Sequence, residues 1–191
     1  RAEDAHLIRA VTAAVPRGVD VMVDANEKCT AAAAHRLCAM AREAGVLFVE
    51  EPLAADDHAG YAALGSAFPG LLATGEHLQG ASEMATLMAD RSVGVLQPDL
   101  AMVGGLTEVL RIARVAAVFG IEVAPHFLPG LFVHVASAAP SITWLEEFPL
   151  LEPLFTGWPE LASDGTLAPR PSLGHGLALL SGARDVFRID I

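Results

Sequence analysis

Short apolar runs that each end in a polar residue recur along the chain. Five of them read VDVMVDAN, VLFVEEP, GLLATGE, VGVLQPD and IEVAPH, at residues 19–26, 46–52, 70–76, 93–99 and 121–126. A sixth and weaker run, ITWLEE, covers residues 142–147. Short continuous apolar runs bounded by polar or turn residues are typical of buried strands, so we predict six strands.

The segments between these runs carry helical patterns. One begins at about Thr30, a suitable N-cap, and ends at Gly45, a residue type that favours the left-handed conformation after a helix. Another ends at Gly120 and aligns small and apolar residues on one face. The predicted helices cover about 4–15, 30–45, 82–90 and 107–119.

The polar residues at the strand ends recur every 20 to 27 positions, and each strand is followed by a helical segment. Such βα repetition predicts a parallel sheet. The sheet could be either open and doubly wound or closed into an eight-stranded barrel. The absence of a GxGxxG or P-loop motif weakens the open, nucleotide-binding sheet. We therefore predict an α/β fold of the (β/α)8, TIM-like type, partial, with about six βα units in residues 1–149. Its missing N-terminal strands would precede Arg1, and residues 150–191 would form an irregular tail packed on the barrel.

Composition limits the partners of the chain. Of its 191 residues 53% are hydrophobic and 18% charged, the net charge is −11, and Lys28 is the only lysine. Nucleic acid and anionic membranes are therefore not expected as partners. No apolar stretch reaches the roughly 18 to 20 residues of a membrane span, and no secretory signal is recognisable. A cytoplasmic location is expected, with Cys29 and Cys38 reduced.

The strand ends concentrate acidic residues at one edge of the predicted sheet. In parallel α/β folds the carboxyl ends of the strands form the functional face. One Asp before a helix can simply be an N-cap, but several carboxylates at one mouth would repel each other unless a cation lay among them. Three hard oxygen donors on successive strands suit Mg²⁺. Glu50, at the end of a rigid strand, is therefore predicted to be a magnesium ligand.

A histidine follows the fifth strand. His126 lies one strand beyond Asp99, so the two side chains could touch and form a general acid/base pair; a core or solvent-facing histidine is the alternative. Glu51 should point away from Glu50 and act as a loop or packing residue. The remaining histidines are assigned no catalytic role: His6 and His35 on helices, His58 in a loop, His134 and His175 without a matching carboxylate, with His77 beside Glu76 at the mouth.

With these residues in place, the sequence resembles the enolase superfamily and its mandelate racemase subgroup. The motifs VDAN, VEEPL, ATGE, LQPD, VGGLTE and APHF occur in the family's order. The resemblance implies that Asp24, Glu50 and Glu76 bind Mg²⁺ and that Asp99 and His126 form the acid/base dyad. It implies further that Glu146 contacts the substrate carboxylate and that Asn26 and His77 touch the substrate. The closest likeness within the subgroup is to acid-sugar dehydratases of the galactarate and talarate type.

The family also carries a K-x-K base motif and an N-terminal capping domain, both of which are expected upstream of Arg1. The function implied is Mg²⁺-dependent abstraction of the proton α to a carboxylate, with dehydration of an acid sugar to a 2-keto-3-deoxy acid. The alternatives are a racemase or epimerase of a 2-hydroxy acid and an inactive metal-binding fragment. A small carboxylate substrate and a homo-oligomer are expected, since relatives are often dimers or octamers.

Overall fold

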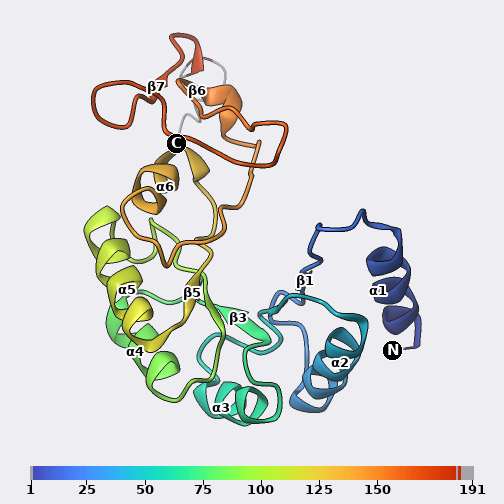
Figure 1. Cartoon of the computed structure of the whole chain (residues 1–191). Coiled ribbons are helices and arrows are strands. Elements are labelled where there is room, and N and C mark those ends of the chain that lie inside the picture. Colours follow the sequence, from blue (N-terminus) through green and yellow to red (C-terminus); the bar gives the residue numbers. More distant parts are fainter. Residues whose placement is uncertain (1, 184, 186–191) are drawn as a thin grey trace.

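The computed structural model describes residues 2–183 and 185, and its elements alternate between helix and strand (Figure 1). The helices are α1 (Ala2–Ala14), α2 (Ala31–Ala44), α3 (His58–Ala67), α4 (Ala81–Ala89), α5 (Leu106–Phe119) and α6 (Pro129–Ala136). The strands of the main sheet are β1 (Val23–Asp24), β2 (Val49–Glu50), β3 (Leu72–Thr74), β4 (Val95–Leu96) and β5 (Glu122–Val123). No helix among the described residues combines the length and hydrophobicity that a bilayer crossing requires.

The main sheet has the order β1-β2-β3-β4-β5, and every pair in it is parallel. The elements from α1 to α6 follow an arc with the helices on its outer side (Figure 1). The weaker sixth run joins the sheet through one parallel bridge, between Val123 and Ile142. This arrangement confirms the predicted partial barrel.

The helix ends follow the sequence signals. Thr30 caps α2 by accepting a hydrogen bond from the backbone N–H of Ala33 at 3.3 Å, and Gly45 ends α2 in the left-handed region with φ 75°. Gly120 ends α5 in the same way, with φ 68°. The placement of His58 in a loop was wrong: this residue begins α3, because Asp57 serves as its N-cap.

Two apolar layers lie on opposite faces of the sheet. Successive strand side chains point to opposite faces, so Val49 packs outward under the helices while its neighbour Phe48 points inward. Phe48 meets Ala73, Val95 and Ala124 in a small inner layer. This inner layer forms the floor below the carboxyl ends of the strands.

The C-terminal segment departs from the βα repeat. It contains a 3₁₀ turn, η1 (Glu152–Leu154), and two short strands, β6 (Phe155–Thr156) and β7 (Ala178–Leu179), that pair antiparallel. It lies beyond α6 at one end of the arc (Figure 1). The boundary at residue 149 and the packing of the tail on a barrel stay predictions.

Candidate active site

Beyond the inner apolar layer, polar side chains follow at the carboxyl ends of the strands, which we call the mouth of the sheet. Asp24 is the register partner of Glu50 on the neighbouring strand. Glu76 follows β3 after Gly75, whose φ of 142° is one that side-chain-bearing residues rarely adopt. A Cβ at Gly75 would also lie 3.0 Å from the backbone N of Gln97. The glycine thus lets two strands approach closely where the Glu76 side chain leaves β3.

The carboxylates at the mouth interact strongly. Burial, followed by repulsion from Asp24 and Glu76, raises the pKa of Glu50 from 4.5 to about 7, although a hydrogen bond with Gln97 acts in the opposite direction. Burial and the nearby charge of Glu51 also raise the pKa of Glu76. Such elevated carboxyl pKa values are typical of acidic groups held together at a functional site.

The three predicted magnesium ligands are only partly brought together. Glu50 and Glu76 are close enough to share a hydrogen bond, whereas Asp24 acts on Glu50 through its charge alone. Asp24 is exposed, and its Oδ1 accepts the backbone N–H of Asn26 at 2.7 Å. Repulsion between the negative carboxylates favours their separation. A donor set made only of carboxylate oxygens fits Mg²⁺. Their joint coordination of one ion stays a prediction.

The contact predicted between His126 and Asp99 is present. His126 Nδ1 lies 3.0 Å from Asp99 Oδ2, and the two residues form a parallel bridge between neighbouring chain segments. The other Asp99 oxygen accepts the backbone N–H groups of Ala101 and Met102 at 2.8 and 2.9 Å, which fixes the carboxylate. The second ring nitrogen, Nε2, lies 3.7 Å from Glu76 Oε2, so the imidazole spans from its orienting aspartate to the carboxylate cluster.

The pKa of His126 reflects opposing effects. Burial disfavours the charged imidazolium, but the hydrogen bond to Asp99 and the charges of Glu76 and Glu146 outweigh burial and raise the pKa above 6.5. Because the Asp99 contact occupies Nδ1, the proton exchanged with another molecule would be held at Nε2. His126 therefore has the geometry of a general acid or base.

A small cavity collects the inward side chains. Its volume is about 200 Å³, and its lining includes Glu50, Gln97, His126 and Glu146 above the apolar floor. One oxygen of Glu146, Oε2, accepts the backbone N–H of Phe127 at 2.6 Å, which holds this carboxylate at the cavity. Two carboxylates, an amide and an imidazole thus converge on one space, as expected of a small-molecule site.

The two residues predicted to touch a substrate lie outside this cavity lining. Asn26 is exposed in the loop after β1. His77 lies behind the mouth, where its Nδ1 is 2.9 Å from Glu51 Oε1. Glu51 is 1% exposed, so it points away from the cavity as expected, but it is an ionisable group with a partner rather than simple packing. Substrate contacts by Asn26 and His77 stay predictions.

Sequence reasoning missed Gln97. Its side chain is 5% exposed, it lines the cavity, and its hydrogen bond favours ionised Glu50. Strand alternation could have indicated it, because Val95 lies in the inner layer and the residue two positions later must point to the same face.

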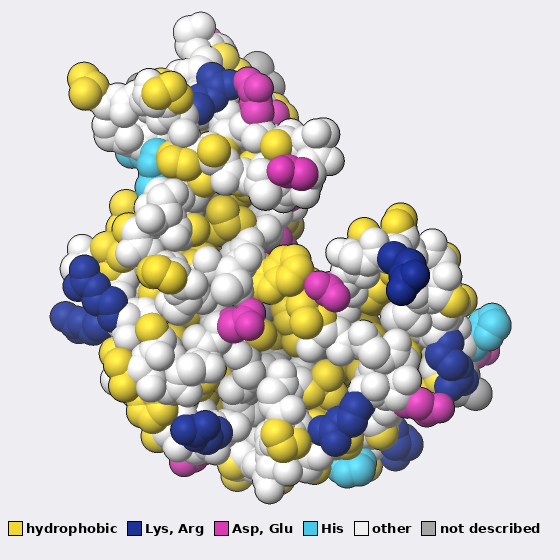
Figure 2. All heavy atoms as spheres, viewed as in Figure 1, with side chains coloured by type: hydrophobic (Ala, Val, Ile, Leu, Met, Phe, Trp, Pro, Cys, Tyr) yellow, Lys and Arg dark blue, Asp and Glu magenta, His cyan; other side chains and the backbone are white. Residues whose placement is uncertain are grey.

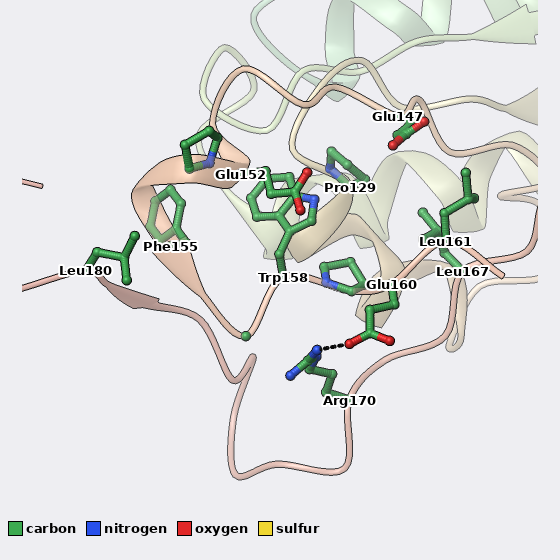
Figure 3. A pocket seen from close by; sticks show the side chains of 13 residues that line it. Pro129, Glu147, Glu152, Phe155, Trp158, Glu160, Leu161, Leu167, Arg170 and Leu180 are labelled. Atoms are coloured by element: carbon green, nitrogen blue, oxygen red, sulfur yellow. Dashed lines mark hydrogen bonds and ion pairs between the residues drawn. The ribbon is translucent and has the colours of Figure 1, made fainter.

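A larger cavity of about 710 Å³ lies in the C-terminal segment (Figure 3). Its lining includes Trp158 and an Arg170–Glu160 ion pair, but no imidazole is among its described lining residues. Figure 2 shows acidic and hydrophobic side chains on the concave side of the arc, with most visible Lys and Arg side chains toward its outer rim. An imidazole and carboxylates instead meet at the smaller cavity at the strand ends.

Comparison with known proteins agrees with this geometry. Residues 1–183 match the family model described as enolase C-terminal domain-like. The L-talarate/galactarate dehydratase of Salmonella typhimurium is 36% identical over 183 residues, which are 96% of this chain and 46% of that protein. The chain thus spans about half the length of this curated relative.

Some solved structures of similar fold contain magnesium. The L-talarate dehydratase of Polaromonas sp. JS666, solved with Mg and L-glucarate, superposes with a TM-score of 0.89 at 38% identity, covering 96% of this chain and 51% of that one. A racemase from Streptomyces coelicolor with bound magnesium superposes with a TM-score of 0.86 at 25% identity, covering 93% and 49%. Because the family model matches residues 1–183, the chain belongs to the enolase C-terminal domain-like family.

Proposed function

We propose that this chain carries the metal and acid/base site of a Mg²⁺-dependent enzyme that removes the proton α to a carboxylate and dehydrates an acid sugar. The observation that carries the proposal is His126, oriented by Asp99 and facing the carboxylates of one cavity. The 36% identity to an L-talarate/galactarate dehydratase supports the sugar-acid substrate class.

The difficult step is removal of a proton next to a group that is already negative. Asp24, Glu50 and Glu76 would hold Mg²⁺, which when bound supplies the positive charge that offsets the second negative charge of the enolate. Glu146 would donate a hydrogen bond, through a shared proton, to the substrate carboxylate as it gains charge. Its Oε2 is held by the Phe127 N–H.

The dehydration balances without any redox partner. A base takes the proton from C2, and the 3-hydroxyl leaves as water with a proton donated by His126 Nε2. The resulting enol tautomerises to the 2-keto-3-deoxy acid. The raised pKa of His126, caused chiefly by its hydrogen bond to Asp99 against the effect of burial, favours the imidazolium form that donates this proton.

A racemase or epimerase of a 2-hydroxy acid is the second candidate, favoured by the magnesium-bound racemase of similar fold. In that reaction His126 would return the proton to the opposite face of C2, and no hydroxyl would leave. The same residues serve both reactions, so substrate and product must decide between them.

The chain spans about half of its curated relatives, so this activity is proposed for the whole protein. A homo-oligomer and a cytoplasmic location are proposed with it.

The test is to incubate the full-length protein and Mg²⁺ with a panel of acid sugars and to measure 2-keto-3-deoxy products. His126→Asn and Glu50→Gln should abolish product formation, while His6→Asn, an exposed change on α1, should not. Exchange of the α-proton for deuterium on a 2-hydroxy acid, with no keto product, would indicate the racemase. If neither reaction occurs although Mg²⁺ binds, the chain is an inactive metal-binding protein and the proposal is wrong.

A further inference from the structure

A second cluster of potential metal ligands lies behind the mouth of the sheet. Glu27, Glu51 and His77 each offer a ligand atom, and these atoms all lie within 4.8 Å of one another. They come from the loops that follow β1, β2 and β3. Among the described residues, no other group of three His, Cys, Asp or Glu side chains brings its ligand atoms this close together.

The central member of the cluster is buried and incompletely paired. Glu51 is 1% exposed, and its Oε2 has no hydrogen-bond partner among the described residues. Its Oε1 lies 2.9 Å from His77 Nδ1. A buried carboxylate oxygen without a partner costs free energy unless a proton donor or a cation meets it.

Glu27 brings a second carboxylate close to Glu51. A neutral hydrogen-bond donor at this place would instead have paired with the Glu51 oxygen. Its Oε1 accepts the backbone N–H of Ala55 at 2.6 Å, which holds the carboxylate in place. The backbone N–H of Glu27 also donates to the Glu51 carbonyl at 2.8 Å, so the two loops are joined. Two carboxylates and one imidazole are thereby fixed around a common point, and His77 alone cannot neutralise both acids.

The separation of one pair of these atoms fits two ligands of a single ion. Two atoms bound at about 2.1 Å and a right angle lie about 3 Å apart, which is close to the separation of His77 Nδ1 and Glu51 Oε1. One nitrogen and two carboxylate oxygens suit a first-row divalent metal such as Zn²⁺, Co²⁺ or Mn²⁺ better than Mg²⁺, which prefers oxygen ligands alone.

An entry path exists as well. A cavity of about 500 Å³ is lined by Glu27 and His77, and further by Asp56 and Glu83, with no Lys or Arg in its described lining. Its acidic wall favours the approach of cations. It differs from the cavity that contains His126, because Glu50 and Glu51 point to opposite faces of the strand end.

We propose that Glu27, Glu51 and His77 form a second cation site, specific for a divalent transition metal and distinct from the predicted magnesium site. The role of the ion follows from its position: it ties together the loops after β1, β2 and β3 and so stabilises the mouth. This site does not depend on the proposed dehydration, because its ligands are different residues.

Co²⁺ binding to the full-length, metal-free protein tests the proposal, with stoichiometry measured by calorimetry and imidazole ligation by the visible spectrum. The wild-type protein should bind two ions. Glu27→Gln and His77→Ala should each weaken one of them at least about tenfold, since loss even of a group that only orients a ligand costs about 10- to 100-fold in affinity. Asp56→Asn, which removes a charge from the same cavity but no ligand, should leave both sites intact.

Glu50→Gln distinguishes this site from the predicted magnesium site. That variant should weaken the other ion while the Glu27-dependent ion remains. The proposal is overturned if Glu27→Gln and His77→Ala bind Co²⁺ as the wild type does. It is also overturned if the wild type binds one ion that only Glu50→Gln affects, in which case His77 and Glu51 form an ion pair and nothing more. Glu27→Gln is nearly isosteric, so it decides the matter even if His77→Ala fails to fold.

Discussion

The elevated pKa of Glu50 predicts that the metal-free protein becomes less stable as the pH rises. In the folded state this carboxyl holds its proton to about pH 7, compared with 4.5 for the free group. A carboxyl whose folded pKa is raised contributes stability below the unfolded pKa, and this contribution is lost as the pH rises through the folded value. The window therefore runs from about pH 4.5 to about pH 7.

The size of the effect follows from the same shift. At 1.36 kcal/mol for each pKa unit the shift corresponds to about 3 kcal/mol, and partial exposure of the side chain reduces our expectation to about 2 kcal/mol. Glu76, Glu51 and His126 also have raised pKa values, so they change stability in the same direction. A variant is needed to isolate the part due to Glu50.

The assay is denaturant unfolding at about pH 5 and about pH 8, without metal and with Mg²⁺. The wild type without metal should lose about 2 kcal/mol more than Glu50→Gln across this interval, because the variant has no proton to release there. Mg²⁺ should restore stability at the higher pH in the wild type and much less in the variant. Equal pH dependence in the two proteins would refute the reasoning, since it would show that Glu50 is ionised in both states.

Three further predictions concern Asp99, Tyr61 and Cys38. Asp99→Asn should lower the rate of the proposed reaction by about two to four orders of magnitude and move the limb of the pH–rate profile that depends on protonated His126 to lower pH, as steady-state assays would show. An unchanged profile would contradict this role. Tyr61→Phe should cost about 1 kcal/mol of unfolding free energy, measured by denaturant titration, because the buried hydroxyl donates to Leu53 O at 2.9 Å; no loss would mean that this bond contributes nothing. Cys38, fully buried and with its pKa raised to about 11 by burial, should react with thiol reagents only when the protein unfolds; rapid labelling of the native protein would contradict its burial.

Much of the fold could be predicted because the local signals agree with the global one. Thr30, Gly45 and Gly120 mark helix ends in the sequence and occupy those positions in the structure. Strand alternation also separates Glu50 from Glu51 without any coordinates. His58 was misplaced because one Asp before it is a weak local signal in the sequence, although in the structure Asp57 does cap α3 by accepting the backbone N–H of Gly60.

The contact between Asp99 and His126 was predictable because it follows from strand order and register. The site was not predictable where loops bring distant residues together. Glu27 meets Glu51 only because its loop folds back, with its φ at 60° and its N–H bonded to the next loop. Spacing along the chain carries no information on such a contact, since a loop of few residues has many possible paths.

The order of the main sheet has a consequence for how the molecule assembles. Each strand from β2 to β5 pairs with the strand that immediately precedes it in the chain. Each pairing spans a single βα unit, so a strand can join the sheet as soon as its own unit has left the ribosome, without waiting for a later part of the chain. A slow codon or a destabilising substitution in one unit should therefore delay the units that follow it and leave the earlier ones folded.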